Sequence, residues 1–245
     1  MNIGADQINL RSLALCSPEQ LNSKFSTTDV IGCGGIGSSV VMALSKMGLQ
    51  NIWVFDDDTL EPHNLGNQFL PYREYCEGNE YIFLGRNKVD AMEGLLVNLL
   101  PDIDTLHFEP ERFTDQTPGS PLVIVTVDSM AARKAIWKHV FDNGVNTRYF
   151  IDARMGAQTL RVFTVDLLDG PNIDHYEDSL YDDDVAVEEP CTARGIVYTS
   201  MFAGAHVANI VKMLATGPQD APWELNHLIE HNAVVTSPQR VQRNG

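Results

Sequence analysis

Cysteine is scarce in this sequence, and the few cysteines form no metal-binding pair. The four are Cys16, Cys33, Cys76 and Cys191. No two of them have the C-x-x-C spacing that structural zinc sites usually contain. A chain of 245 residues with four cysteines is also an unlikely carrier of a disulfide framework. We therefore expect no zinc and no fold that depends on disulfides.

Basic residues are also few. The chain has 17 Lys and Arg against 33 Asp and Glu, which gives a formal net charge of −16. A surface this acidic repels phosphate backbones and anionic lipid headgroups. We therefore expect no nucleic-acid partner and no membrane, although a partner with a basic face remains compatible with the charge.

Long hydrophobic runs are missing too. The longest uncharged apolar stretch, residues 195–211, contains Ser, Thr, His and Asn and falls short of the ~20 residues of a membrane-spanning helix. The first 15 residues lack the basic start and apolar run of a signal peptide. These features predict a soluble, cytoplasmic protein.

What the sequence does contain is an alternation of strands and helices. Apolar runs and amphipathic stretches alternate from about residue 28 to 155, which predicts a parallel sheet with right-handed crossovers. Residues 156–167 alternate like an antiparallel strand. The expected fold class is α/β: a Rossmann-like, mostly parallel sheet, helices on both faces and an antiparallel extension toward the C-terminus. We expect one domain, 1–245.

Three later segments have distinct compositions. Residues 172–190 carry eight carboxylates and no Lys or Arg, which predicts an exposed, mobile loop. Residues 192–214 predict a long apolar helix. Residues 236–245 predict a frayed tail.

A glycine-rich turn follows the first predicted strand. In "DVIGCGGIGSSV", Gly32, Gly34 and Gly37 have the spacing of a loop that holds phosphates at a helix N-terminus. Asp56 ends the second strand 19 residues later, where a carboxylate binds ribose hydroxyls. These residues indicate a nucleotide site, and they fit NAD and ATP equally well.

Further polar residues favour ATP over NAD. They are Asp58, Asn64, Gln68, Lys88 at the start of a helix and Asp128 after the buried strand "PLVIVTVD". A lysine and a carboxylate that meet at phosphates suit a magnesium nucleotide. Each has a simpler explanation by itself: Lys88 as a solvated helix residue, Asp128 as a helix N-cap, Asn64 as a turn residue. The ordered combination is the stronger signal.

The ordered motifs "GCGGIGS", "DDDTLEPHNLGNQ", "GRNKVDAMEGLLVNLLPDI", "VTVDSMAARKAI" and "CTARGIVYTSMFAGAHVANIVKML" resemble the ThiF/MoeB/ubiquitin-activating-enzyme family over residues ~28–215. The resemblance implies an adenylyltransferase that uses ATP and Mg²⁺. Its substrate is the C-terminal carboxylate of a small ubiquitin-like or sulfur-carrier protein, usually ending in Gly-Gly. The family also implies a homodimer or a related heterodimer. It further implies that the acidic loop 172–190 is a crossover loop above the bound carrier tail; the simpler alternative is a solvated linker.

The resemblance assigns roles to individual positions. Gly32, Gly34, Gly35 and Gly37 line the phosphates, Asp56 takes the ribose, Asp58, Asn64 and Gln68 complete the ATP site, Lys88 contacts phosphate, and Asp128 serves Mg²⁺ and the reacting centre. Asn67 departs from the family, which has arginine there to balance charge as pyrophosphate leaves. Arg11 from a partner subunit, Arg73 and Arg86 are the candidate replacements.

Cys191 matches the position of a reactive cysteine found in several members of the family. A thioester or an acyl-disulfide would form there after adenylation, with the thiolate favoured by a helix N-terminus and opposed by Glu188 and Glu189. The simpler alternative is a buried structural cysteine.

Three other functions stay open at this point. One is adenylation of a peptide or of a tRNA nucleoside. Another is a partner or scaffold subunit that has lost catalysis, which Asn67 favours. The last is an NAD oxidoreductase, which Lys88, Asp128 and Asn64 disfavour.

Overall fold

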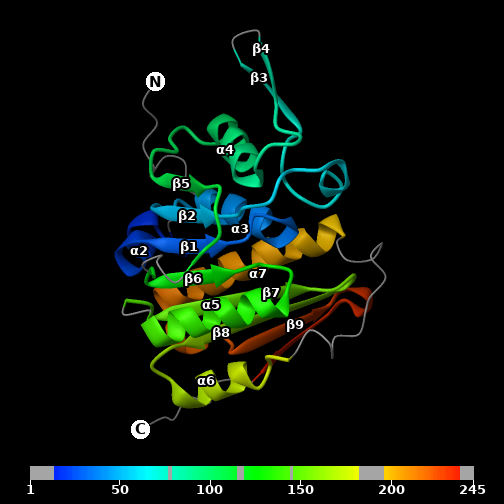
Figure 1. Ribbon diagram of the computed structural model, residues 1–245. Coiled ribbons are helices and arrows are strands. Elements are labelled where there is room, and N and C mark those ends of the chain that lie inside the picture. Colours follow the sequence, from blue (N-terminus) through cyan, green and yellow to red (C-terminus); the bar gives the residue numbers. More distant parts are fainter. Residues whose placement is uncertain (1–13, 77–78, 115–118, 144–145, 182–195, 238–245) are drawn as a thin grey trace.

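The computed structural model describes residues 14–76, 79–114, 119–143, 146–181 and 196–237. Within these residues, eight strands form one large sheet (Figure 1). In spatial order they are β10 (Ala233–Ser237), β9 (Glu224–Leu228), β8 (Thr159–Asp166), β7 (Tyr149–Met155), β6 (Leu122–Val125), β1 (Thr28–Ile31), β2 (Ile52–Phe55) and β5 (Leu106–Glu109).

The sheet has a parallel half and an antiparallel extension. Strands β7, β6, β1, β2 and β5 run parallel to their neighbours. Strands β8, β9 and β10 continue the sheet from β7 in antiparallel pairs. The predicted fold class is therefore confirmed.

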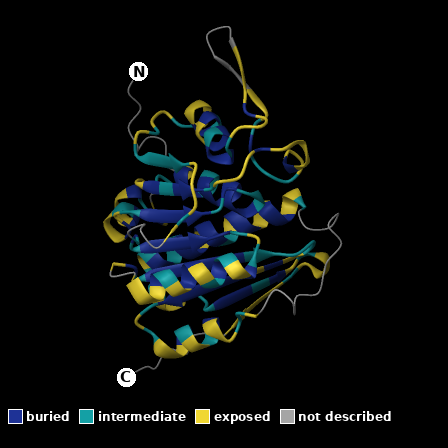
Figure 2. Ribbon diagram, viewed as in Figure 1, coloured by how far each residue is buried: buried dark blue, intermediate teal, exposed yellow. Residues whose placement is uncertain are grey.

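Helices cover both faces of the sheet. On one face lie α2 (Pro18–Lys24), α3 (Gly35–Lys46), α4 (Lys88–Leu99) and α7 (Val197–Thr216); on the other lie α5 (Met130–Asn143) and α6 (Gly170–Glu177). Three short 3₁₀ helices, η1 (Pro62–Asn64), η4 (Pro218–Asp220) and η5 (Ile229–His231), lie in connections. Figure 2 shows the buried sheet between helices whose outer faces are exposed.

Strand β6 explains why a central strand of this sheet is a continuous apolar run. Leu122 and Ile124 pack into the apolar cluster on the α3 side, and Val123 and Val125 into the cluster on the α5 side. All four side chains are fully buried. Burial of each such side chain contributes about 1.5–3 kcal/mol, and a strand buried on both faces favours apolar residues at consecutive positions.

Helix α7 packs closely against α3. A Cβ atom at Gly204 would lie 2.8 Å from the main-chain oxygen of Ser39, so only glycine permits this approach. The predicted helix 192–214 is present from Val197 and extends to Thr216. No helix within the described ranges combines the length and the apolar character that crossing a membrane requires.

The sequence predicted a loop throughout the acidic segment 172–190, and this prediction is wrong for its first residues. Its first residues belong to α6, in which Asn172 and Tyr176 are buried. The Asn172 side chain accepts a hydrogen bond from the Asp166 amide at 2.8 Å and donates one to the Thr164 carbonyl at 3.1 Å. The prediction failed because the exposed acids of α6 gave the segment a polar composition, although one face of the helix is buried. Residues 182–190 lie outside the described residues.

The C-terminal strands were missing from the sequence interpretation. Strand β9 pairs with β8, and β10 pairs with β9, so that Thr236 and Ser237 lie opposite Leu225 and Glu224. The first two residues of the tail that was predicted to fray, Thr236 and Ser237, therefore belong to strand β10. The remaining residues of the tail lie outside the described part of the chain.

A hairpin arm interrupts the stretch that the sequence predicted to be mostly loop. It consists of β3 (Arg73–Cys76) and β4 (Asn79–Ile82), which pair only with each other among the described residues. Figure 1 shows this arm projecting from the body beyond α4. The arm lies between the Gln68 region and Lys88, and it accounts for the length of that stretch.

Candidate nucleotide-binding site

The glycine-rich loop and Asp128 follow neighbouring strands. The loop comes after β1 and Asp128 after β6, and these two strands are adjacent and parallel. From β1 the chain continues through α3 to β2, whereas from β6 it continues through α5 on the opposite face to β7. This divergence is the switch point of a doubly wound sheet, where such folds bind ligands.

The glycine-rich loop has a shape that only glycine allows at two positions. Gly32 has a φ of 98°, and a Cβ atom at Gly37 would lie 1.9 Å from the Gly32 oxygen. The Thr126 hydroxyl donates to the same oxygen at 2.8 Å and fastens the loop to the end of β6. Helix α3 begins with Gly34 as its N-cap and without a side-chain cap, so its first N–H groups can receive an anion.

Asp56 lies beside this loop, where the sequence placed it. Its carboxylate accepts hydrogen bonds from the Cys33 amide at 2.6 Å and from the Asp58 amide at 2.8 Å. Burial raises the pKa of Asp56, and these N–H groups and the charge on Lys88 partly offset the rise. A carboxylate oxygen can accept more than one hydrogen bond, so Asp56 retains capacity for ribose hydroxyls.

Lys88 is a buried cation at the first position of α4. Its ammonium group lies 2.7 Å from the Asp58 carboxylate, and its side chain is 8% exposed while that of Asp58 is 66% exposed. Burial lowers the pKa of Lys88, but the hydrogen bond to Asp58 and the charge of Asp56 outweigh burial, so the net change is upward. Lys88 is therefore charged at neutral pH.

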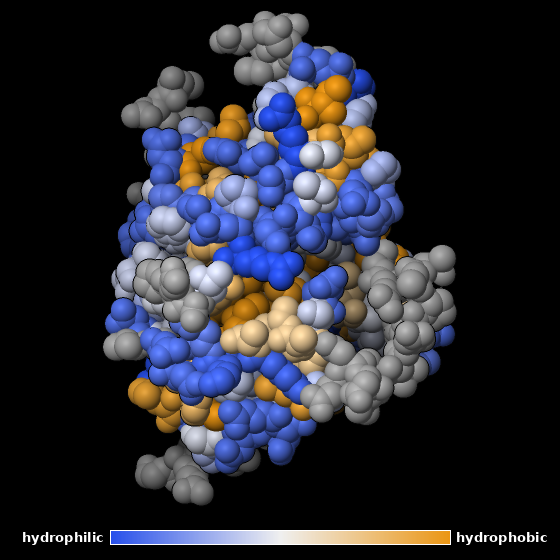
Figure 3. Space-filling model, in the orientation of Figure 1, coloured by the Kyte–Doolittle hydropathy of each residue, from blue (hydrophilic) through white to orange (hydrophobic). Residues whose placement is uncertain are grey.

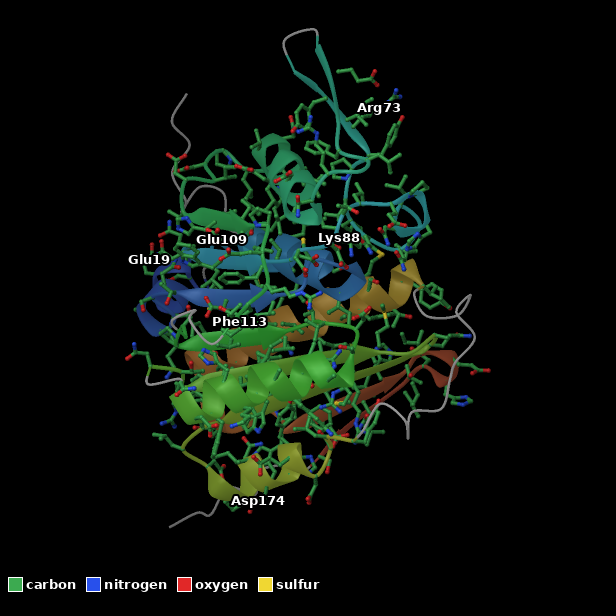
Figure 4. The ribbon with its side chains drawn as sticks, in the orientation of Figure 1. Glu19, Arg73, Lys88, Glu109, Phe113 and Asp174 are labelled. Carbon is green, nitrogen blue, oxygen red and sulfur yellow. The ribbon has the colours of Figure 1, made fainter. Side chains whose placement is uncertain are left out.

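Figure 4 shows Lys88 at the start of α4, near the carboxyl ends of the parallel strands. The Asp58 main-chain oxygen also accepts a hydrogen bond from the Lys88 amide at 3.0 Å. Two segments about 30 positions apart are thereby fixed together. Lys88 is therefore not the solvated helix residue that the sequence left open as the simpler explanation.

The polar residues around η1 also lie beside the loop. Asn64 is buried, and its side-chain oxygen accepts from the Glu61 amide at 2.9 Å, so it serves the turn as the simpler explanation proposed. A Cβ atom at Gly35 would lie 3.3 Å from the main-chain oxygen of Asn67, so the Asn67 backbone lies close to the glycine-rich loop.

Two side-chain oxygens near η1 have no hydrogen-bond partner in the part of the chain that the structure describes. Asn67 Oδ1 and Gln68 Oε1 are buried and make no hydrogen bond to the described residues. A Cβ atom at Gly34 would lie 3.9 Å from the side-chain nitrogen of Gln68. Because buried polar groups are normally hydrogen-bonded, two unsatisfied amides at the glycine-rich loop fit a site that is completed by a polar ligand.

Asp128 is exposed and lies three residues after the last residue of β6. It is not the N-cap of α5: the Ser129 hydroxyl accepts from the Ala132 amide at 3.2 Å and takes that role. The described residues contain no group of three or more potential metal ligands. A single carboxylate at a phosphate site still fits Mg²⁺, which is commonly held by one or two carboxylates together with substrate phosphates and water.

The two described candidates for the missing positive charge are engaged within the hairpin arm. Arg73 pairs with Glu80 at 3.0 Å, and Figure 4 shows it well away from Lys88. The Arg86 guanidinium stacks 4.4 Å from the centre of the Tyr81 ring. The third candidate, Arg11, lies outside the described residues.

Cys191 also lies outside the described residues. Cys33, inside the glycine-rich loop, is fully buried, and burial strongly raises the pKa of its thiol. Cys33 is therefore a packing residue. Cys16 is likewise buried.

Two groups of charged residues at this edge were missed from the sequence. Arg112, after β5, pairs with Asp57 at 2.7 Å. Asp152 and Arg154 on β7 form a buried cluster with Arg133 of α5. The alternation in "DAR" places Asp152 and Arg154 on one face of a strand, but nothing in the spacing indicates Arg133 as their neighbour.

Figure 3 shows that hydrophilic residues cover much of one face, with hydrophobic residues gathered in a hollow across its middle.

The fold and the loops at its switch point define an α/β protein of Rossmann-like architecture with the features of a nucleotide site. The chain belongs to the ThiF family, whose family model matches residues 5–242. The predicted family is confirmed.

Curated relatives are modifier-activating enzymes and an adenylyltransferase. The chain is 31% identical over 133 residues to ubiquitin-like modifier-activating enzyme 5 of Bombyx mori, covering 48% of this chain and 31% of that protein. It is 29% identical over 122 residues to the adenylyltransferase and sulfurtransferase UBA4 of Meyerozyma guilliermondii, covering 48% and 27%. The match thus spans about a third of these relatives, and their names agree with the predicted enzyme class.

Solved structures share the fold. Escherichia coli MccB, in a structure with AMPCPP and MccA, aligns with a TM-score of 0.70 and 18% identity over 99% of this chain and 73% of that chain. PaaA aligns with a TM-score of 0.62 and 17% identity over 89% of this chain and 64% of that chain. At these identities the likeness shows the architecture.

Proposed function

We propose that this protein is an ATP-dependent adenylyltransferase that activates the C-terminal carboxylate of a small ubiquitin-like or sulfur-carrier protein ending in Gly-Gly. The observation that carries the proposal is the buried, charged Lys88 beside Asp56 and the glycine-rich loop. A dinucleotide site needs the loop and the acid, but not a lysine held at the phosphates. The named activities of the relatives support the same class.

In this proposal ATP lies along the carboxyl ends of β1 and β2. The triphosphate meets the N–H groups at the start of α3, and the ribose hydroxyls bond to Asp56. Lys88 exchanges its exposed partner Asp58 for phosphate oxygens. Because the Lys88 side chain is already buried and positioned, little conformational entropy is lost when the nucleotide binds.

Asp128 would hold Mg²⁺ in this arrangement, and the metal would supply positive charge that withdraws electron density from the phosphoryl oxygens. The carrier carboxylate attacks the α-phosphorus of ATP in line. A bond forms between the carboxylate oxygen and phosphorus as the bond to pyrophosphate breaks. The products are the carrier acyl-adenylate and pyrophosphate, whose charge Lys88 helps to neutralise.

Cys191 is proposed to act after adenylation. Its thiolate attacks the acyl carbon, a thioester forms and AMP leaves. The protein is proposed to work as a homodimer, in which Arg11 of one subunit supplies the charge that Asn67 does not. Replacement of Cys191 by Ala should leave adenylation intact and abolish a carrier conjugate that dithiothreitol cleaves; a conjugate that persists would rule out this step.

The test is ATP–pyrophosphate exchange with a panel of Gly-Gly carriers, with and without Mg²⁺. The expected result is carrier-dependent exchange that requires Mg²⁺ and is lost in Lys88→Ala and Asp128→Ala. Lys138→Ala is the matched control, because Lys138 is exposed on α5 and pairs with Asp142. Its exchange should equal that of the unmodified protein.

A second function is favoured by one specific feature. Asn67 replaces a family arginine, and the two described candidates, Arg73 and Arg86, contact residues of the hairpin arm. If ATP binds but no carrier supports exchange, the protein is a partner or scaffold subunit. If NAD binds and ATP does not, the adenylyltransferase proposal is wrong.

A further inference from the structure

A buried cluster of charges lies beneath the carboxyl ends of β6 and β7. At its centre is the Asp152 carboxylate, which is fully buried. It accepts hydrogen bonds from Arg133, from Arg154 at 2.7 Å and from the Tyr176 hydroxyl at 3.1 Å. Asp152 lies opposite Val125, the last residue of β6, so the cluster adjoins the candidate site.

The cluster contains two arginines for one carboxylate. Burial lowers the pKa of Arg133, and the neighbouring charge of Arg154 adds to this effect. Removal of a guanidinium from water is costly unless all its donors are well placed. The remaining donors of Arg133 therefore indicate what else it holds in place.

Those donors reach the loop that carries Asp128. Arg133 donates one hydrogen bond to the main-chain oxygen of Val127, the residue directly before Asp128. It donates another to the Ala153 oxygen at 3.3 Å. A single guanidinium thus joins β7 to the backbone of the β6–α5 loop.

The same loop is fixed on both sides of Asp128. Thr126 is tied to the glycine-rich loop through its hydroxyl, 2.8 Å from the Gly32 oxygen. Ser129 caps α5. Asp128 therefore projects an exposed carboxylate from a backbone whose neighbouring residues are each held by a hydrogen bond.

We propose that Arg133, fixed by Asp152, is a positioning residue that aims the Asp128 carboxylate at the magnesium nucleotide. This inference rests on the proposed function and adds a residue to it. Arg133 acts through the Val127 carbonyl and has no contact with substrate. Groups of this kind around a metal ligand typically change metal affinity by about 10–100-fold when they are lost.

The test is calorimetric titration of the full-length protein with ATP, once with Mg²⁺ and once with EDTA. For Arg133→Met we expect Mg²⁺-ATP affinity to fall about tenfold, while ATP affinity in EDTA stays unchanged. Arg133→Lys keeps a cation against Asp152 but has no second arm for Val127. Arg133→Lys should show a smaller loss of Mg²⁺-ATP affinity, again with no change of ATP affinity in EDTA. It replaces Arg133→Met as the test variant if Arg133→Met does not fold.

The matched control is Arg148→Met. Arg148 lies at the other end of the β7 region and pairs with Asp166 at 2.8 Å. It should leave both affinities unchanged, whatever its effect on thermal unfolding.

A double mutant separates positioning from general destabilisation. In an Asp128→Ala background, Arg133→Met should cause no further loss of Mg²⁺-ATP affinity, because the group that it aims is absent. A full additional loss, or an equal loss in EDTA, would overturn the positioning role. If the unmodified protein shows no Mg²⁺-dependent ATP binding, the proposed function itself fails and this inference falls with it.

Discussion

The parallel half of the sheet and its antiparallel extension use buried polar residues differently. In the parallel half, Lys88 and Asp56 lie near each other at the carboxyl ends of the strands, and Asp58, the partner of Lys88, is largely exposed. In the extension, Glu224 bonds locally to Arg161 at 2.6 Å and to His175 at 2.9 Å. All parallel strands end at the same edge, so their loops bring polar groups together, whereas antiparallel strands alternate in direction.

The comparison predicts that substitutions at the carboxyl edge of the parallel half change ligand binding. Substitutions in the extension should change stability instead. Four experiments test this division.

The largest effect is expected for Gly37→Ala. The added methyl would lie 1.9 Å from the Gly32 oxygen, so the glycine-rich loop or α3 must move. We expect ATP binding to be lost in calorimetry. Gly66→Ala is the control, because a Cβ atom there meets nothing within 4 Å; equal losses in both variants would contradict the argument.

Lys88→Met should sharpen the comparison by separating activity from stability. Loss of a positioned cation should reduce pyrophosphate exchange by about 10²–10³-fold. The abandoned partner Asp58 is 66% exposed and can be hydrated, so the unfolding temperature should change little. A large fall in that temperature, measured calorimetrically, would assign Lys88 to the structure rather than to the site.

Asp29 tests the opposite end of the parallel strands. It is buried in β1 and accepts from the Ser120 amide and hydroxyl at 3.0 and 2.7 Å. Burial raises the pKa of this carboxyl to about 6. The native protein thus holds the proton more tightly than the unfolded chain, and stability falls as pH rises from about 4 to about 6.

Asp29→Asn should remove this pH dependence. From pH 4 to pH 7.5, the variant should gain about 3 kcal/mol in free energy of unfolding relative to the unmodified protein, an order-of-magnitude value. Urea denaturation at both pH values measures the difference. A constant difference would show that Asp29 does not titrate in this range.

Asn172→Ala is expected to have the smallest effect and to act in the extension. It leaves the Asp166 amide and the Thr164 carbonyl without their side-chain partner, at a cost of about 1–2 kcal/mol in unfolding free energy. ATP affinity should not change. Asp174→Ala, exposed on the same helix as Figure 4 shows, is the control and should leave stability near that of the unmodified protein.

Much of the parallel half was predictable because its signals are local. The run at β6, the glycine spacing and the acid after β2 each occupy a few consecutive residues, and the structure contains them as expected. Helix α6 was not predicted because it lies at the start of an acidic segment, where the exposed Asp174 and Glu177 alternate with the buried Asn172 and Tyr176. Strand β9 escaped prediction because buried Glu224 and His227 interrupt its apolar pattern.

The sequence by itself determined the alternation of strands and helices, the glycine-rich loop and the residue types of a nucleotide site. Periodicity and short motifs follow from the geometry of neighbouring residues, so they can be read without the fold. Only the tertiary structure decided that Lys88 pairs with Asp58 and that Arg133 reaches both Asp152 and the loop before Asp128. Those contacts depend on how distant segments pack, and no spacing along the chain encodes which side chains the packed core brings together.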